Sequence, residues 1–297
     1  MFLYLIDYSQ ALKTEIANQL HHLLVYLILA ATYVSYGRVD RFFGVFPFAG
    51  DLADTKVINV IISILIRTSL SQNPWKRDEF NLVRVIWHGH SCFELEGKSV
   101  TIVIDPFKGI GIPEPKAAAE IVLCSHSHQD HNNIKPVLAK QGETLESFVG
   151  SKRVKGVSVK GVASFHDDAT GSKRGTNSIY SFSLDGVQFC HLGDLGHELS
   201  SAAVEEIGKV DVLFVPVGGY FTIGPETATR VCEQLKPKII IPMHYRMPEL
   251  ASMFGQLKRV DDFLEGKSSI ERIKEPFLSV EEGKLPKEPR ILVLFLK

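Results

Sequence analysis

The sequence feature that most constrains this chain is the stretch CSHSHQDHNN, residues 124–133, which places three histidines and an aspartate within six positions. It continues the apolar run EIVLCS, whose β-branched residues predict a buried strand that ends where the cluster begins. Side chains alternate along a strand, so His126 and His128 should point the same way, while Asp130 and His131 lie in the following turn. Neutral imidazole and carboxylate groups are zinc ligands, and this one loop can offer two ligands to each of two ions.

Three further ligand-type side chains occur at the ends of predicted strands elsewhere in the chain. His166 follows GVASF, Asp194 follows VQFCHLG, and His244 follows KIIIPM. A histidine at the end of a strand is more often a packed or hydrogen-bonded side chain than a ligand, so each one alone is weak evidence. Because all three come directly after buried β runs, we expect them to converge on one rim of the sheets.

Short β-branched runs and glycine turns dominate the chain after residue 80, and strands alternate with helical patterns in its second half. This order predicts an α/β or α+β fold in which helices pack outside the sheets. The predicted strands lie at 82–89, 92–97, 99–107, 120–125, 157–164, 179–184, 187–191, 212–217, 239–241 and 291–296. The predicted helices lie at 117–119, 200–207, 226–234 and 247–260.

The composition argues against several classes of protein and of site. The 33 Lys and Arg residues nearly balance 34 Asp and Glu, so a nucleic-acid or membrane partner would need a local patch. The four cysteines are widely spaced and form no C-x-x-C pair, which argues against a cysteine zinc knuckle and favours a reducing cytoplasm. Lys152, Arg153 and Lys155 form a basic cluster without interleaved aromatic residues, so we expect a solvated face and no nucleic-acid partner.

A change in composition near residues 73–82 predicts an apolar helical extension at 1–80 and a main domain at 81–297. Residues 1–72 contain only ten charged residues and include two apolar runs, at 23–36 and 57–66. A spanning helix needs about 20 apolar residues, so both runs are short for one. Three interpretations stay open: membrane association through residues 20–70, packing on the main domain or a partner, and a start placed upstream of the true one.

The motifs of the main domain resemble those of the metallo-β-lactamase superfamily. SHSHQDH matches the H-x-H-x-D-H motif, and WHGHSCFEL, IDPF, HLGDLGH, PVGGYFTIGP and IPMHYR occur in the order found in one branch of small metal-dependent hydrolases. That branch is similar to the ascorbate-6-phosphate lactonases. The resemblance covers about residues 83–297, leaves out residues 1–80, and implies a four-layer αββα sandwich with two metal ions between the sheets.

The resemblance also implies a role for each candidate ligand. His126, His128 and His166 would bind one ion, Asp130, His131 and His244 would bind the second, and Asp194 would bridge both. Zinc is the expected metal, with manganese or iron as alternatives. Asp130 would in addition be the catalytic residue that orients the nucleophile or accepts its proton.

Other residues are expected around this centre. Asp105, at the end of TIVIDPF, matches the aspartate that supports the ligands in the superfamily, although a turn-forming role is equally compatible. His90, in GHSCF, is a second supporting residue, with a purely structural role as its alternative. Lys173 and Arg174 in TGSKRGTN, and Tyr220 in GGYFTIGP, are candidate substrate contacts; the alternatives are a solvated hairpin and a plain junction between a loop and a helix.

Together these features predict a cytoplasmic enzyme, membrane-associated if the extension binds lipid. It would hydrolyse a small ester, lactone or phosphoester with two divalent metal ions and a metal-activated hydroxide. One alternative is a membrane-associated protein that binds or senses metal without catalysis. Another is a nuclease or phosphodiesterase of the same fold, which would need a basic groove that the sequence does not indicate.

Overall fold

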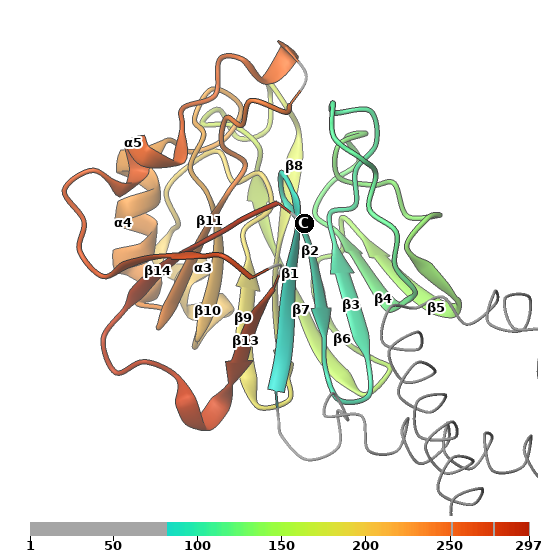
Figure 1. The fold of residues 1–297 in the computed structure, drawn as a ribbon. Coiled ribbons are helices and arrows are strands. Elements are labelled where there is room, and N and C mark those ends of the chain that lie inside the picture. Colours follow the sequence, from blue (N-terminus) through green and yellow to red (C-terminus); the bar gives the residue numbers. More distant parts are fainter. Residues whose placement is uncertain (1–81, 251, 276, 297) are drawn as a thin grey trace, which may run out of the picture. The chain divides into compact units, whose positions relative to one another are not determined.

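Two β-sheets face each other across a shared hydrophobic core, and helices lie outside one of them (Figure 1). This computed structural model describes residues 82–250, 252–275 and 277–296. The predicted extension at 1–80, its boundary and its membrane-related interpretations lie outside the described residues. Within the described ranges, none of the helices combines the length and the apolar character needed to cross a bilayer.

The first sheet has six strands in the order β13-β1-β2-β3-β4-β5. Neighbours β1, β2 and β3 are antiparallel, whereas β3, β4 and β5 are parallel, so β1, β3 and β4 all run in one direction. The C-terminal ends of these three strands therefore share one edge of the sheet. The strands are β1 (Leu82–Gly89), β2 (Cys92–Glu96), β3 (Thr101–Ile104), β4 (Ala119–Cys124), β5 (Leu138–Glu146) and β13 (Leu278–Glu281).

The second sheet has eight strands in the order β12-β14-β11-β10-β9-β8-β7-β6. Strands β6 to β9 alternate in direction, whereas β9, β10 and β11 are parallel, so the C-terminal ends of β7, β9, β10 and β11 lie at one edge. The strands are β6 (Gly150–Val154), β7 (Val157–Phe165), β8 (Thr176–Leu184), β9 (Val187–His191), β10 (Val212–Pro216), β11 (Ile239–Met243), β12 (Ile270–Ile273) and β14 (Arg290–Leu294).

The alternation of side chains along the strands explains how the six-stranded sheet is covered on both faces. On β4, Ile121 and Leu123 belong to the core between the sheets, whereas Val122 and Cys124 belong to a second apolar cluster on the opposite face. The two sheets meet through aromatic rings such as those of Phe93 and the β10 residue Phe214, whose centroids are 4.3 Å apart. Full burial of each such ring stabilises the fold by about 2–3 kcal/mol.

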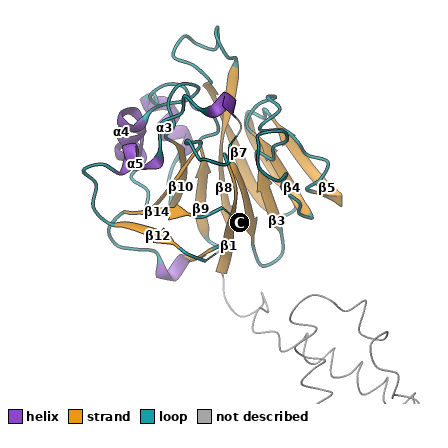
Figure 2. Cartoon of the chain, turned by 45° about the horizontal axis from the view of Figure 1, so that its top comes forward, coloured by secondary structure: helices purple, strands orange, loops and turns teal. Residues whose placement is uncertain are grey.

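The outer layers of the two sheets differ. The helices α3 (Ser201–Ile207), α4 (Pro225–Leu235) and α5 (Val260–Leu264) lie outside the eight-stranded sheet (Figure 2). Among the described residues, the outer face of the other sheet is covered by the loops around Phe107 to Ile112 and by the 3-10 helix η3 (Ser252–Phe254). The mixed α/β two-sheet fold predicted from sequence is confirmed, with loops where the resemblance implies helices.

Two of the predicted helices are wrong. Residues 117–119 contain no helix, because Ala119 already starts β4 and is fully buried between β3 and β5. Within 247–260, the described residues form turns and η3 instead of one helix, and α5 begins only at Val260. The segment's apolar residues Leu250, Phe254 and Leu257 have helical spacing but pack as a bent loop against the six-stranded sheet. The helices predicted at 200–207 and 226–234 are confirmed as α3 and α4.

Candidate metal centre

The ligand-type side chains follow strands whose C-terminal ends share an edge in each sheet. On the six-stranded sheet, His90 follows β1, Asp105 follows β3, and the segment 126–131 follows β4. On the eight-stranded sheet, the corresponding positions after β7, β9 and β11 are occupied by His166, Asp194 and His244. The direction of the strands, rather than their separation in sequence, therefore brings these residues to one place.

Asp194 lies at the centre of the group, with only 1% of its surface exposed. Its Oδ2 atom lies 3.2 Å from Nε2 of His166 and 3.2 Å from Nε2 of His244. The Nε2 atoms of His131 and His126 lie 3.3 Å and 4.0 Å from the same oxygen. One carboxylate from the eight-stranded sheet is thus surrounded by imidazoles from both sheets.

Three groups of these side chains have ligand atoms close enough to bind a common metal ion, since the atoms within each group lie within 4.8 Å of one another. The groups are His126, His128 and His166; His126, His131 and Asp194; and His90, Asp130, His131 and His244. The first group contains the residues expected at the first ion. The third contains those expected at the second ion, together with His90.

Asp105 controls the orientation of two of the imidazole rings. Its Oδ2 accepts a hydrogen bond from the Ser125 hydroxyl (2.8 Å) and lies 2.9 Å from Nδ1 of His131. The Ser125 hydroxyl, having donated its only proton, accepts from Nδ1 of His126 at 2.9 Å. This network assigns the ring proton to Nδ1 of both histidines and leaves Nε2 as the lone-pair atom. Asp105 thus contacts one candidate ligand, His131, directly and a second, His126, through Ser125.

Two hydrogen-bond acceptors face each other at the centre: the imidazole Nε2 lone pairs and the Asp194 carboxylate. A positive charge between them removes this unfavourable contact. Nε2 of His126 and Nε2 of His131 face the Asp194 carboxylate, and neither has a hydrogen-bond partner among the described residues. Burial lowers the pKa of His131, but Asp194, Asp130 and Asp105 raise it well above its usual range, so this position favours a positive charge, supplied either by a second ring proton or by a metal ion. A cation between these atoms removes the conflict, and imidazole nitrogen with carboxylate oxygen is a donor set that suits zinc. The residues present therefore fit a divalent metal ion.

Asp130 contacts the buried ring of His90 on one side and is partly exposed to solvent. Its side chain is 26% exposed, and its Oδ2 lies 3.2 Å from Nε2 of His90. His90 is fully buried, and its ring centroid lies 4.1 Å from that of His244. Burial and the neighbouring His244 lower the pKa of His90 to about 4, so the ring is neutral at pH 7 and donates its Nε2 proton to Asp130.

Asn177 locks the turn that carries Asp194. This buried amide accepts a hydrogen bond from the Asp194 backbone N–H (2.9 Å) and donates to the Leu192 carbonyl (2.9 Å) and to the Ser164 hydroxyl (2.8 Å). Gly193, between the two held residues, has a positive φ of 55°. A Cβ atom there would also overlap the Asn177 amide oxygen, so the turn requires glycine.

The loop after β10 approaches the backbone of His244 very closely. A Cβ atom on Gly218 would overlap the His244 carbonyl oxygen, so only glycine allows the two strands to end side by side at this distance. His244 itself has a positive φ of 51°, an uncommon conformation that aims its ring into the centre.

The three candidate substrate contacts fall in different environments. Lys173 is exposed, with its Nζ 2.7 Å from Asp168 Oδ1. Arg174 is half-buried, and its guanidinium carbon lies 5.5 Å from the centre of the Phe221 ring. Tyr220 is 53% exposed, with its ring 4.6 Å from that of Phe221. The structure thus brings Arg174 and Tyr220 to the same aromatic ring and keeps Lys173 on the exterior.

Four residues of the centre are missing from the sequence-based predictions. Ser125 is hidden by the ligands that follow it, although a hydroxyl between a strand and a histidine is a usable signal. Asp167 directly follows His166 and reads as an ordinary loop residue. Asn177 is the second residue of β8, just after a glycine turn, and carries no ligand signal in the sequence. Phe221 carries no chemical signal, because its role comes only from its neighbours.

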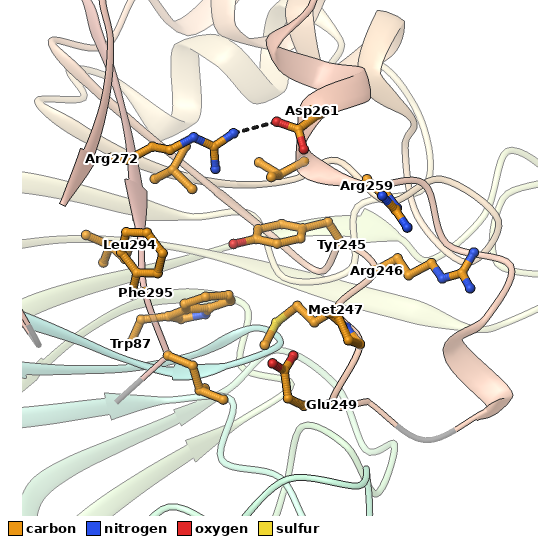
Figure 3. A pocket seen from close by; sticks show the side chains of 14 residues that line it. Trp87, Tyr245, Arg246, Met247, Glu249, Arg259, Asp261, Arg272, Leu294 and Phe295 are labelled. Carbon is orange, nitrogen blue, oxygen red and sulfur yellow. Dashed lines mark hydrogen bonds and ion pairs between the residues drawn. The ribbon is translucent and has the colours of Figure 1, made fainter. Parts of the chain in front are cut away.

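A cavity of 410 Å³ lies apart from this centre (Figure 3). Trp87 and Tyr245, whose ring centroids are 5.5 Å apart, form its floor with apolar residues of β14, and an ion pair between Arg272 and Asp261 lies above Tyr245. None of the candidate ligands lines it. It is therefore distinct from any cleft over the histidine cluster.

Comparisons with known proteins agree with this geometry. The family model for the Beta-lactamase superfamily domain matches residues 84–244. A UPF0173 metal-dependent hydrolase of Methanoculleus marisnigri is 31% identical over 226 residues, which cover 68% of this chain and 97% of that protein. One from Thermococcus kodakarensis is 31% identical over 210 residues, covering 60% of this chain and 92% of that protein.

Solved structures show the same relationship. A crystal structure from Thermotoga maritima, named provisionally as a Zn-dependent hydrolase of the metallo-β-lactamase superfamily, has a TM-score of 0.60 and 41% identity, and covers 71% of this chain and 98% of that chain. A Veillonella parvula structure with a TM-score of 0.50 and 15% identity, covering 68% of this chain and 99% of that chain, supports the fold alone. The chain therefore belongs to the metallo-β-lactamase superfamily, within the branch formed by the UPF0173 metal-dependent hydrolases.

Proposed function

We propose that this chain is a binuclear metal-dependent hydrolase that acts on a small ester, lactone or phosphoester. The observation that carries the proposal is the position of Asp194 Oδ2 among four imidazole Nε2 atoms, at 3.2 to 4.0 Å. Asp194 belongs to a ligand group that shares His126 with the first of the other two groups and His131 with the second, which is the arrangement that a bridging ligand needs. Two relatives of this chain in the same superfamily are named metal-dependent hydrolases, which supports the same conclusion.

Each ion would take ligands from both sheets. The first would be held by His126, His128 and His166, the second by Asp130, His131 and His244, with Asp194 shared between them. Zinc is our first choice, and manganese and iron have compatible ligand preferences. When bound, such a pair of ions lowers the pKa of a water molecule and polarises the oxygen of the bond under attack.

The protein groups around this site have distinct tasks. Asp105 holds His131 directly and His126 through Ser125, so both rings keep their Nε2 lone pairs directed at the centre. His90 donates to one carboxylate oxygen of Asp130, whose side chain stays 26% exposed. Asp130 is thereby placed to orient a water molecule or to accept its proton, which is the catalytic role that we assign to it.

Metal content is the direct test of the binuclear site. The full-length chain, saturated with Zn²⁺ and freed of excess by gel filtration, should retain about two ions per chain by elemental analysis. Asp194→Ala should lose at least one of them. His126→Gln removes another candidate ligand. His88→Gln is its matched control, because His88 pairs with Glu94 (2.8 Å) and lies outside the three ligand groups. A wild-type chain that retains a single ion would contradict the binuclear proposal.

Activity is tested on a panel of carboxyl esters, lactones, and phosphate mono- and diesters, with Zn²⁺ and Mn²⁺. His126→Gln serves as the inactive reference and His88→Gln as the active one. Turnover of one class by both the wild type and His88→Gln, but not by His126→Gln, identifies the reaction. Equal turnover by all three proteins would show that the hydrolysis does not use this centre.

A further inference from the structure

Arg174 is a half-buried cation whose charge is not matched by the protein. Among the described residues, no carboxylate lies within ion-pair distance of its guanidinium. The guanidinium carbon instead lies over the ring of Phe221, 5.5 Å from the ring centroid. The neighbouring cation, Lys173, differs: it is exposed and paired with Asp168 at 2.7 Å. Removing an arginine partly from water without a counter-ion is unfavourable, so a group that supplies the negative charge would bind there favourably.

The loop that carries Arg174 is built to hold it in place. The buried carboxylate of Asp167 accepts four backbone hydrogen bonds at 2.7–2.9 Å. The donors are the N–H groups of Ala169, Gly171, Lys173 and Arg174. Because Asp167 directly follows His166, this loop is tied to a candidate ligand by a single peptide bond. The position of Arg174 is therefore fixed relative to the metal centre.

Phe221 links this arginine to the centre on the other side. Its ring is edge-on to the His244 ring, with centroids 6.5 Å apart, and is packed against Phe254 at 6.4 Å. The guanidinium of Arg174 thus lies one aromatic ring away from a candidate ligand. A substrate whose reacting bond sits at the metals could therefore place a second, remote group beside Arg174.

We propose that Arg174 is the specificity-determining residue of this enzyme and binds an anionic group, phosphate or carboxylate, that the substrate carries away from the bond that is hydrolysed. The inference rests on the proposed hydrolase function, which leaves the rest of the substrate open. Arginine suits the role because its planar fork donates two parallel hydrogen bonds to either anion. A cation–π contact with Phe221 uses none of the N–H donors of the guanidinium, so they stay available to a ligand.

The test compares substrates that differ only in the remote group. The full-length, Zn²⁺-loaded chain is assayed with three esters that share one leaving group: 4-nitrophenyl butyrate, mono-4-nitrophenyl glutarate and 4-nitrophenyl 4-phosphonobutyrate. Arg174→Gln should lower kcat/KM for the two anionic esters about 10- to 100-fold, mainly through KM, since hydrogen bonds to charged groups have that strength. The neutral ester should change less than about 3-fold, which also shows that the variant is folded.

Two further variants sharpen the comparison. Arg174→Lys keeps the charge without the fork and should recover part of the loss. Arg153→Gln makes the same chemical change on the exposed face of β6 and should leave all three esters unaffected. The anionic ester whose kcat/KM falls more in Arg174→Gln shows whether the site prefers the carboxylate or the phosphonate. An equal loss for neutral and anionic esters, or no loss for either, would overturn the proposal.

Calorimetry separates this inference from the proposed function. 4-Phosphonobutyrate has no bond to hydrolyse, and its dissociation constant should be about 10-fold or more weaker for Arg174→Gln than for Arg153→Gln. If the wild type cleaves none of the esters, the hydrolase proposal fails in this assay while the anion site is still decided by binding. Equal affinity of the two variants for 4-phosphonobutyrate would refute the anion site, whatever the esters show.

Discussion

Replacing Asn177 with alanine tests whether the metal centre depends on the residue that shapes the Asp194 turn. The amide makes three hydrogen bonds inside the protein, and its removal leaves the Asp194 N–H and the Leu192 carbonyl buried without their partner. Each orphaned group costs about 1–3 kcal/mol, whereas Ser164 keeps its own bond to the Asn177 carbonyl. We expect Asn177→Ala to lower the free energy of unfolding by about 3 kcal/mol.

Urea denaturation of chelator-treated protein measures this loss without a contribution from bound metal. Fluorescence reports the transition, because Trp87 is 3% exposed in the core. Asn132→Ala is the matched control, since its side chain makes a single exposed hydrogen bond to the Ser127 carbonyl (2.9 Å), and it should cost less than about 1 kcal/mol.

The same variant should also bind metal more weakly. The turn positions the Asp194 carboxylate, and residues that orient ligands typically change metal affinity by about 10- to 100-fold. Competition with a chromophoric chelator gives the affinity. If Asn177→Ala loses no more stability than Asn132→Ala, or binds Zn²⁺ as tightly as the wild type, the reasoning that this amide organises the centre is refuted.

Three other changes probe neighbouring parts of the structure. Gly218→Ala should lower the free energy of unfolding by about 1–3 kcal/mol, because its Cβ would overlap the His244 carbonyl. Gly283→Ala, with open space around it, is the control in the same urea titration. Equal losses of stability in the two variants would contradict the packing argument. Asp105→Asn should weaken Zn²⁺ binding about 10- to 100-fold in chelator competition, and unchanged affinity would exclude its supporting role. Burial raises the pKa of Asp167, but four backbone N–H donors lower it from 3.8 to about 2, so its charge stabilises the folded state above about pH 4 and this contribution is lost as the pH falls toward 2. The difference in urea midpoint between wild type and Asp167→Asn should therefore narrow from pH 5 to pH 3, and a constant difference would rule this out.

Strand ends are the part of this protein that the sequence predicts well. His126 and its neighbours form a contiguous motif, His244 follows the apolar strand IIIPM, and Asp194 follows the mostly buried strand VQFCH, so the strand pattern and the residue type point to them. The two-sheet fold follows from the same runs. The segment 247–260 was misread because its apolar spacing matches a helix, while its real partner is the face of a sheet.

The supporting residues could not be found in the same way. Ser125 matters because its hydroxyl lies between Asp105 and His126, and Asn177 matters because three separate segments meet at its amide. Both relationships are made by the tertiary fold and leave no periodicity in the chain. Arg174 was identified as a cation in a turn, but its contact with Phe221, from a different strand end, appears only in three dimensions.

The division of the ligands between the two sheets has a mechanical consequence. His126 and His131 extend from one sheet, whereas His166, Asp194 and His244 extend from the other, so ions bound among them would join the two halves at their common rim. Such a cross-link exists only when both sheets are assembled, and its binding energy is therefore added to the resistance of the fold to unfolding. Stripping the ions from this protein would loosen the seam between the sheets as well as abolish turnover.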